Sequence, residues 1–255
     1  MFDREAIARK LCVDYPTPDQ LALMNACKKK GQADFAANEM ISVPILASDN
    51  LLREDLTVWQ DLSLESMRDS YRGQVLMMDH DWGQVNKALG FVYDAELFRF
   101  DNPGPAQLNL ILDNSINPRL DYEVIKKCGK YQAVICYAAI PADSPAINAI
   151  RYLQLNDVSS GGFTRQQSYE CPLCGGDFGK EDPHYLPGMW SQLLVAWGDI
   201  EPEDVAPYAF YNATHFSKEL SFVTAGNVPS ARIFDERLTK LVSLWTKLSL
   251  ERFLF

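Results

Sequence analysis

The chain has 255 residues, of which 47% are hydrophobic and 23% are charged, and its formal net charge is −10. This composition is that of a globular protein with a sizeable core, and the acidic balance argues against nucleic acid as a partner, because nucleic-acid-binding surfaces are usually basic. The longest apolar run, at residues 133–142, is too short to span a bilayer, and the charged N-terminus lacks the apolar stretch of a secretory signal. We therefore expect no membrane partner, no nucleic-acid partner, and reduced cysteines in a cytosolic setting.

Residues 3–30 are predicted to form two helices, which make an N-terminal arm. The second helix has a complete start signal, with Thr17 as the N-cap, Pro18 at the first helical position and Gln20 three residues after the cap. Its end is marked by three lysines and Gly31.

From residue 40 the pattern favours strands. Residues 41–45 alternate between apolar residues and Ser42 or Pro44, and the proline indicates an edge strand. A short helix over 64–71 is expected to be capped by Ser63 and ended by Gly73. Residues 75–78 and 91–97 are the next predicted strands.

The second half of the chain continues this pattern. A turn at residues 102–105 precedes Leu108, Leu110 and Leu112, whose alternation predicts another strand. Further strands are predicted at 131–139, 150–158 and 219–223, and the apolar spacing over 238–248 predicts a C-terminal helix. The sum is an α+β domain with a β-rich centre and helices at both ends.

His80, in the segment Asp79-His80-Asp81, is the first candidate for chemistry. An imidazole titrates near working pH and can therefore take a proton from a hydroxyl. The two flanking aspartates are able to orient the ring and stabilise its charged form. The ordinary alternative for such a segment at the end of a strand is a solvated turn.

Ser159 and Ser160 are the second candidates, because they precede two glycines at the end of a predicted strand. A serine with neighbours that lack side chains can be approached closely by a substrate backbone, and backbone N–H groups there can face an oxyanion. The sequence alone does not decide between the two serines, and a plain turn is the ordinary alternative.

Cys171 and Cys174 have the Cys-x-x-Cys-Gly spacing of half a zinc knuckle, and His184 follows. A fourth ligand is expected from Asp182, although aspartate is less usual at structural zinc. Such a zinc ion would be structural and would staple a loop too short to have its own core. A loop without metal is the alternative, whereas a redox motif is disfavoured because no thioredoxin-like pattern surrounds the cysteines.

Glu219 opens the segment Glu219-Leu220-Ser221-Phe222-Val223, which is followed by an Asn-x-Pro-x-Ala segment at 227–231. By itself Glu219 reads as an ordinary surface carboxylate on a strand.

Taken together and in this order, the segments resemble the prohead (capsid maturation) serine protease family of tailed phages, over residues 38–234. The resemblance rests on His80-Asp81 followed by Leu89-Gly90-Phe91-Val92, on the serines before Gly161, and on the two closing segments that begin at Glu219 and at residue 227. A subset of the family is similar in carrying a Cys-x-x-Cys-Gly segment and a downstream Cys-x-His-x-x-Gly segment after the serine. Asp182 stands where that subset has its third cysteine.

The resemblance implies a closed or barrel-like β core, as in herpesvirus assembly proteases. It implies peptide-bond hydrolysis through an acyl-enzyme, with Ser159 or Ser160 as the nucleophile, His80 as the base and Glu219 as the third member. We favour Ser159, which directly follows the strand-like Asp157-Val158. No cofactor is expected for catalysis, and a structural zinc ion is the one metal expected. The implied partners are the major capsid protein and the scaffold, with a homo-oligomer left open, and the implied locations are the host cytoplasm, the inside of the procapsid or the virion capsid.

The corresponding domain division is an N-terminal helical arm at 1–38, a protease-like domain at 39–234 with a Cys-x-x-Cys/His loop insertion at 164–190, and a C-terminal helix at 235–255. Two other functions are weighed against an active protease. One is an inactive structural capsid protein, such as a cement or decoration protein, on a protease-like fold. The other is an unrelated zinc-knuckle binding module.

Overall fold

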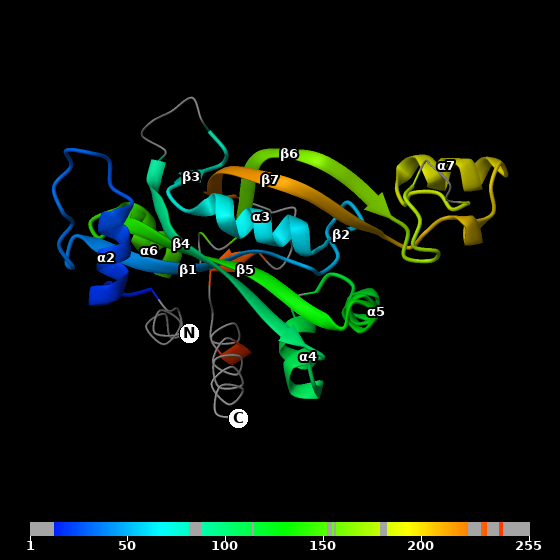
Figure 1. Ribbon diagram of the computed structural model, residues 1–255, viewed down its shortest axis with the longest axis horizontal. Coiled ribbons are helices and arrows are strands. Elements are labelled where there is room, and N and C mark those ends of the chain that lie inside the picture. Colours follow the sequence, from blue (N-terminus) through cyan, green and yellow to red (C-terminus); the bar gives the residue numbers. More distant parts are fainter. Residues whose placement is uncertain are drawn as a thin grey trace, which may run out of the picture.

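The computed structural model describes residues 13–81, 88–113, 115–151, 155, 157–178, 183–223, 231–233 and 240–241 (Figure 1). Within them the helices are α2 (Pro18–Ala26), α3 (Asp61–Tyr71), α4 (Pro105–Leu112), α5 (Pro118–Cys128), α6 (Pro145–Arg151), α7 (Met189–Trp197) and the 3-10 helix η2 (Pro202–Asp204). The strands are β1 (Met40–Asp49), β2 (Thr57–Trp59), β3 (Val75–Met78), β4 (Ala88–Asp101), β5 (Lys130–Pro141), β6 (Val158–Glu170), β7 (Ala209–Phe222) and β8 (Arg232–Ile233). The predicted α+β class is confirmed.

The strands form one mixed sheet in the order β2-β7-β3-β4-β5-β1-β8, and β6 pairs with β7 beside this path. Strand β7 runs parallel to β2 and β3 and antiparallel to β6. The ladders leave the sheet mostly open. A single isolated bridge between Asp157 and Arg232 joins the start of β6 to β8, at the far end of the strand order.

The start of α2 agrees with the prediction from sequence. Thr17 accepts a hydrogen bond from the Gln20 N–H, and the Gln20 side chain accepts one from the Thr17 N–H, which together make a capping box. Met24 is fully buried against Tyr93 and Ala139, so this helix is docked on the sheet. The first predicted helix lies almost entirely outside the described residues.

Helix α3 packs along β7 and also contacts β4 and β5 (Figure 1). Its buried residues Leu64, Met67 and Tyr71 belong to the main hydrophobic core. The predicted capping by Ser63 is wrong, because the helix begins two residues earlier and Ser63 is buried inside it.

Three serines of α3 satisfy the edge of β7 that lies between β2 and β3. We call Ser63, Ser66 and Ser70 the serine ladder. Their hydroxyls accept from successive outward N–H groups of β7: Ala213 to Ser63 at 3.0 Å, His215 to Ser66 at 2.9 Å and Ser217 to Ser70 at 3.0 Å. Backbone donors that would otherwise be buried without a partner are thereby paired, and the sheet continues past the gap between its two short parallel strands.

Two of the strand predictions are wrong. Residues 105–112 form α4, because Pro105 occupies the first turn, where its missing N–H costs nothing, and the leucines pack as part of a helix. Ile150 and Arg151 belong to α6, and the strand of that region begins only at Val158. Helices α5 and α7 were not predicted, although α5 has an N-cap at Asn117 and a left-handed Gly129 at its end.

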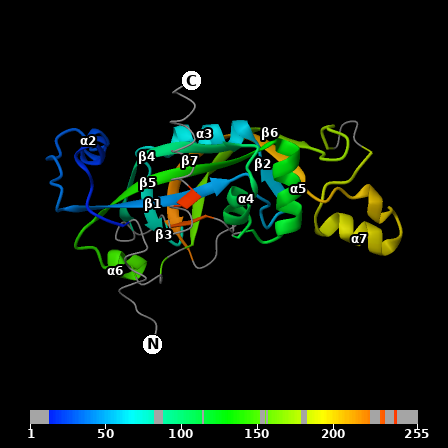
Figure 2. The same cartoon turned by 90° about the horizontal axis from the view of Figure 1, so that it is seen from below.

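The region around α7 forms a lobe at one end of the molecule, beyond the far ends of β6 and β7, in both Figure 1 and Figure 2. Met189, Trp190 and Trp197 of this helix are among the most exposed large hydrophobic residues of the described chain. None of the described helices is long and apolar enough to cross a membrane. The predicted C-terminal helix lies outside the described residues except for Lys240 and Leu241, which are helical.

Candidate active site and metal centre

His80 lies in the turn that directly follows β3. Asp79 and His80 both have left-handed backbone angles, with φ of 55° and 54°. This conformation is uncommon for residues other than glycine and costs free energy at each position. The turn is tied to β7 by the Asp79 N–H, which donates to the Phe222 carbonyl at 2.9 Å. As a result the imidazole of His80 is directed toward β7.

Glu219 lies in β7, between Val75 of β3 and Gly161 of β6. Its side chain is 0% exposed, which is rare for a carboxylate unless it is paired. It is paired twice, because Oε1 contacts Nδ1 of His80 and Oε2 accepts a hydrogen bond from the hydroxyl of Ser221. The sequence reading of Glu219 as an ordinary surface carboxylate is therefore wrong.

The pairing of His80 with Glu219 determines what the imidazole can do. A carboxylate accepts hydrogen bonds, so the His80 nitrogen beside it, Nδ1, carries a proton in the neutral ring. The other nitrogen, Nε2, then has the free lone pair that a general base needs. The His80 side chain is 39% exposed while its partner is fully buried. The ring is thus held from the buried side and is open to a substrate from the other.

The two candidate serines lie on opposite faces of the sheet. Ser159 is directly opposite Ser221 in the β6–β7 ladder, and directly opposite residues point to the same side. Ser159 therefore shares its face with Glu219 and Ser221. Ser160 is opposite the core residue Leu220 and lies close to the buried phenol of Tyr71, whose pKa is raised by burial.

At Gly161 and Gly90 a side chain would collide with a neighbouring strand, so packing requires glycine at both positions. A Cβ at Gly161 would lie 2.1 Å from Oε1 of Glu219, so only glycine leaves room for the buried carboxylate. A Cβ at Gly90 would lie 1.9 Å from the backbone oxygen of Ala139 in β5. Gly90 is therefore needed for strand packing and takes no part in the candidate site.

Cys171, Cys174 and His184 come together at the end of β6 in a candidate metal centre. Their ligand atoms all lie within 4.8 Å of one another, which is close enough to hold a metal ion. Sγ of Cys171 and Nδ1 of His184 are 3.6 Å apart. Tetrahedral zinc with Zn–S of about 2.3 Å and Zn–N of about 2.05 Å places such a pair about 3.6 Å apart.

The backbone around the two cysteines is arranged to support thiolates. The Leu173 N–H approaches Sγ of Cys171 at 3.4 Å, and the Gly176 N–H approaches Sγ of Cys174 at 3.4 Å. Gly175 has a φ of +78°, which gives the tight turn after the second cysteine. Hydrogen bonds of this kind orient metal ligands and stabilise their negative charge. Asp182, the predicted fourth ligand, lies outside the described residues.

Sequence reasoning missed two contributors to the site, Ser221 and Gly161. Their roles follow from their positions relative to Glu219, once the pairing of β6 with β7 is known. Ser221 is two residues after Glu219, so the two side chains share one face of the strand, and Gly161 is the residue opposite the carboxylate.

Comparison with known proteins gives no matching family model, no matching curated protein and no matching solved structure.

Proposed function

We propose that this chain is a serine endopeptidase of the capsid maturation type. The observation that carries the proposal is the contact between His80 and the fully buried Glu219, two residues 139 positions apart in the sequence. A histidine held by a buried carboxylate supplies two members of a catalytic triad, and Ser159 lies on the same sheet face as the carboxylate.

In this proposal Ser159 is the nucleophile. Nε2 of His80 takes its proton as the hydroxyl attacks the scissile carbonyl, and the same nitrogen returns the proton to the leaving amine. Glu219 keeps the ring in the required tautomer and stabilises the imidazolium that forms. Ser221 holds the second oxygen of that carboxylate, so that the carboxylate cannot rotate away from the ring.

The proposed relation to assembly proteases includes a closed β core. The bridge between Asp157 and Arg232, with the Val158 N–H donating to the Ala231 carbonyl at 3.1 Å, supports closure of the sheet between β6 and β8. Closure there would hold the serine-bearing start of β6 from both sides. The major capsid protein and the scaffold are the proposed substrates, and the procapsid interior is the proposed place of action.

We also propose that Cys171, Cys174 and His184 hold a structural zinc ion, with Asp182 as the fourth ligand. The 3.6 Å separation and the two N–H···S contacts support zinc over a bare loop. In the described residues this site is at the opposite end of β6 from Ser159, so its role is to stabilise the lobe that carries α7.

The first test uses an alkyl fluorophosphonate, which forms a covalent bond with an activated serine and requires no knowledge of the substrate. We expect labelling of the peptide that contains Ser159, and loss of labelling in Ser159→Ala and in His80→Ala. Ser160→Ala and Ser168→Ala should keep it. Labelling that depends on Ser160 instead would overturn the assignment of the nucleophile while keeping the reaction class.

The second test addresses the substrate. The cognate major capsid protein is co-expressed with the chain, and its intact mass is measured beside a run with the double variant Ser159→Ala, Ser160→Ala. We expect shortening only with the unchanged chain. No shortening and no fluorophosphonate labelling would favour an inactive structural capsid protein on the same fold.

A further inference from the structure

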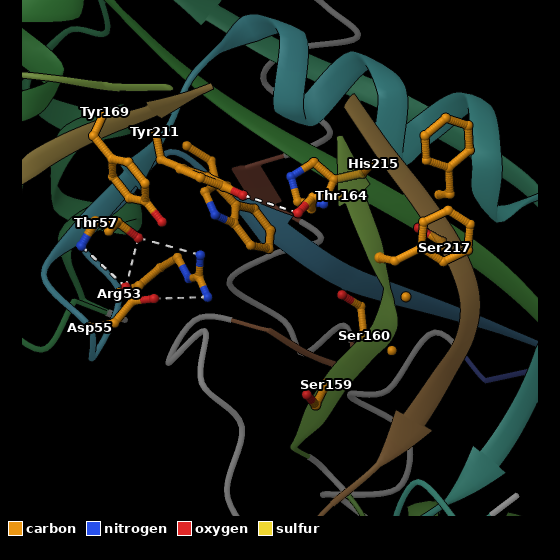
Figure 3. A pocket seen from close by; sticks show the side chains of 15 residues that line it. Arg53, Asp55, Thr57, Ser159, Ser160, Thr164, Tyr169, Tyr211, His215 and Ser217 are labelled. Carbon is orange, nitrogen blue, oxygen red and sulfur yellow. Dashed lines mark hydrogen bonds and ion pairs between the residues drawn. The ribbon is translucent and has the colours of Figure 1, made fainter. Parts of the chain in front are cut away.

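A pocket of about 290 Å³ lies beside β6 and β7 (Figure 3). Its lining takes residues from both faces of β6, with Ser159 and Gly161 from the face of Glu219 and Ser160, Gly162 and Thr164 from the opposite face. The partners of Gly162 and Thr164 in β7 are Ser217 and His215. Six of the 15 lining residues carry rings, and the lining also includes Arg53 and several hydroxyl groups; the rings are those of Trp59, Phe163, Tyr169, Tyr211, His215 and Phe216.

Among the residues that line the pocket, Arg53 is the only arginine or lysine. Its side chain is 13% exposed, and its guanidinium lies 4.2 Å from the centre of the Trp59 ring. Figure 3 shows the two contacts of its terminal nitrogens, to Asp55 at 3.2 Å and to Thr57 at 3.3 Å. A guanidinium has five N–H donors, so these contacts leave donors available.

His215 adds no positive charge to the pocket. Burial, together with the nearby charge of Arg53, lowers its pKa to about 4, so the ring is neutral at pH 7. In the described residues the buried atoms Nε of Arg53, Nε1 of Trp59 and Nε2 of His215 have no hydrogen-bond partner. Two of these three are obligatory donors. Arg53 and Trp59 therefore each have an N–H donor without a partner.

The one carboxylate of the lining, Asp55, is already engaged. Asp55 pairs with Arg53 through one oxygen, and its other oxygen accepts from the N–H and the hydroxyl of Thr57. A cationic ligand would thus meet Arg53 with no free carboxylate to receive it. An anion with flat geometry instead matches the fork of the guanidinium.

We propose that this pocket binds a carboxylate carried on a short or aromatic group. A single cation suits the single charge of a carboxylate better than the higher charge of a phosphate, and the rings of the lining suit an apolar or ring-bearing body. The site goes beyond the proposed protease function, because neither His80 nor Glu219 lines it, and it borders the proposed nucleophile, since Ser159 is among its lining residues.

The test monitors the indole N–H signal of Trp59 by NMR in the full chain, assigned through Trp59→Phe. Two acids and their matched amides are titrated. N-acetylglutamic acid amide against N-acetylglutamine amide tests a side-chain carboxylate, and N-acetylphenylalanine against its amide tests a terminal carboxylate. We expect at least one acid to shift the signal with a Kd at least tenfold lower than that of its amide, and the better acid identifies the source of the carboxylate.

Variants distinguish a loss of the Arg53 charge from a general effect on the fold. Arg53→Met should raise the Kd of the acid at least tenfold. Arg53→Lys keeps the charge but loses the forked N–H donors of the guanidinium, so its Kd for the acid should lie between those of the unchanged chain and Arg53→Met. Arg99→Met is the matched control, because Arg99 pairs with an aspartate, as Arg53 does, and does not line the pocket. Equal binding of acid and amide, no shift with either acid, or unchanged binding in Arg53→Met would each overturn the proposal.

Discussion

Gly161 and Glu219 lie directly opposite each other in the β6–β7 ladder, and the glycine makes the space that the glutamate fills. A Cβ at position 161 would be 2.1 Å from Oε1 and 2.8 Å from Cγ of Glu219. The same Oε1 contacts His80. The absence of one side chain on β6 therefore decides whether the carboxylate on β7 can reach the imidazole.

Gly161→Ala should displace Glu219 and break its contact with His80. We expect a loss of roughly 1–3 kcal/mol in the free energy of unfolding, as for other overpacked cores, and a loss of fluorophosphonate labelling. Gly104→Ala is the control, because its Cβ would meet only the flexible side chain of Gln107 at 3.0 Å. Equal labelling in both variants would contradict the role given to Gly161.

Glu219→Gln keeps the size of the side chain but removes the charge that orients and stabilises the imidazolium. We expect the rate of fluorophosphonate labelling to fall about a hundredfold or more, since triads depend strongly on the correct histidine tautomer. Ser221→Ala should have a smaller effect, because it removes one contact of the carboxylate and leaves the carboxylate itself. Single-turnover labelling kinetics measure both, and an unchanged rate in Glu219→Gln would exclude Glu219 from the triad.

The metal centre predicts one zinc ion per chain by elemental analysis of the purified protein. Cys171→Ser and His184→Ala should lower the zinc content and the melting temperature, because metal binding at a closed site contributes directly to folding. Cys128→Ser, a change of a cysteine that lies outside the candidate metal centre, is the control and should keep the metal. Asp182→Ala tests the fourth ligand, and full zinc content in that variant would show that another group completes the site.

His215 predicts that stability depends on pH in the acid range. Its folded pKa of about 4 lies below the unfolded value of 6.5, so the unfolded chain binds more protons between these values. The stability contributed by neutral His215 is therefore complete above pH 6.5 and is lost as the pH falls toward 4. After allowance for its partial exposure, we expect about 1–2 kcal/mol. Urea unfolding at a series of pH values should give a flatter profile for His215→Gln, and an identical profile would contradict this.

Replacing a serine of the serine ladder should lower the free energy of unfolding, although the hydrophobic core stays intact. Ser63→Ala and Ser70→Ala should each leave a backbone N–H of β7 without its partner, at a cost of about 1–3 kcal/mol each. Glu65→Ala, on the exposed face of the same helix, should be nearly neutral. Hydrogen exchange at Ala213 and Ser217 gives a local readout, and unchanged protection there would show that the hydroxyls are dispensable.

Local signals predicted the elements that depend on local chemistry. The capping box at Thr17 fixed the start of α2, because both hydrogen bonds form within four residues. The alternation around residues 91–97 and the apolar run at 75–78 predicted parts of β4 and β3, because the spacing of apolar residues is also a local property of the sequence. The leucines after Pro105 were misread, because apolar residues two apart fit either a strand or one side of a short helix, and the proline decided in favour of the helix.

For the candidate site, too, local segments indicated some features and only the tertiary structure showed the others. The sequence by itself supplied the residue types, His80, the paired serines, Glu219 and the cysteine–histidine set, since each stands in a short segment with recognisable chemistry. Only the tertiary structure decided that Glu219 is buried against His80, that Ser159 and Ser160 face opposite sides, and that Arg53 reaches a pocket beside β6 and β7. These depend on strand register and on contacts between residues far apart in the chain. A shift of one residue in register would exchange the faces of both serines, and nothing in a local segment specifies that register.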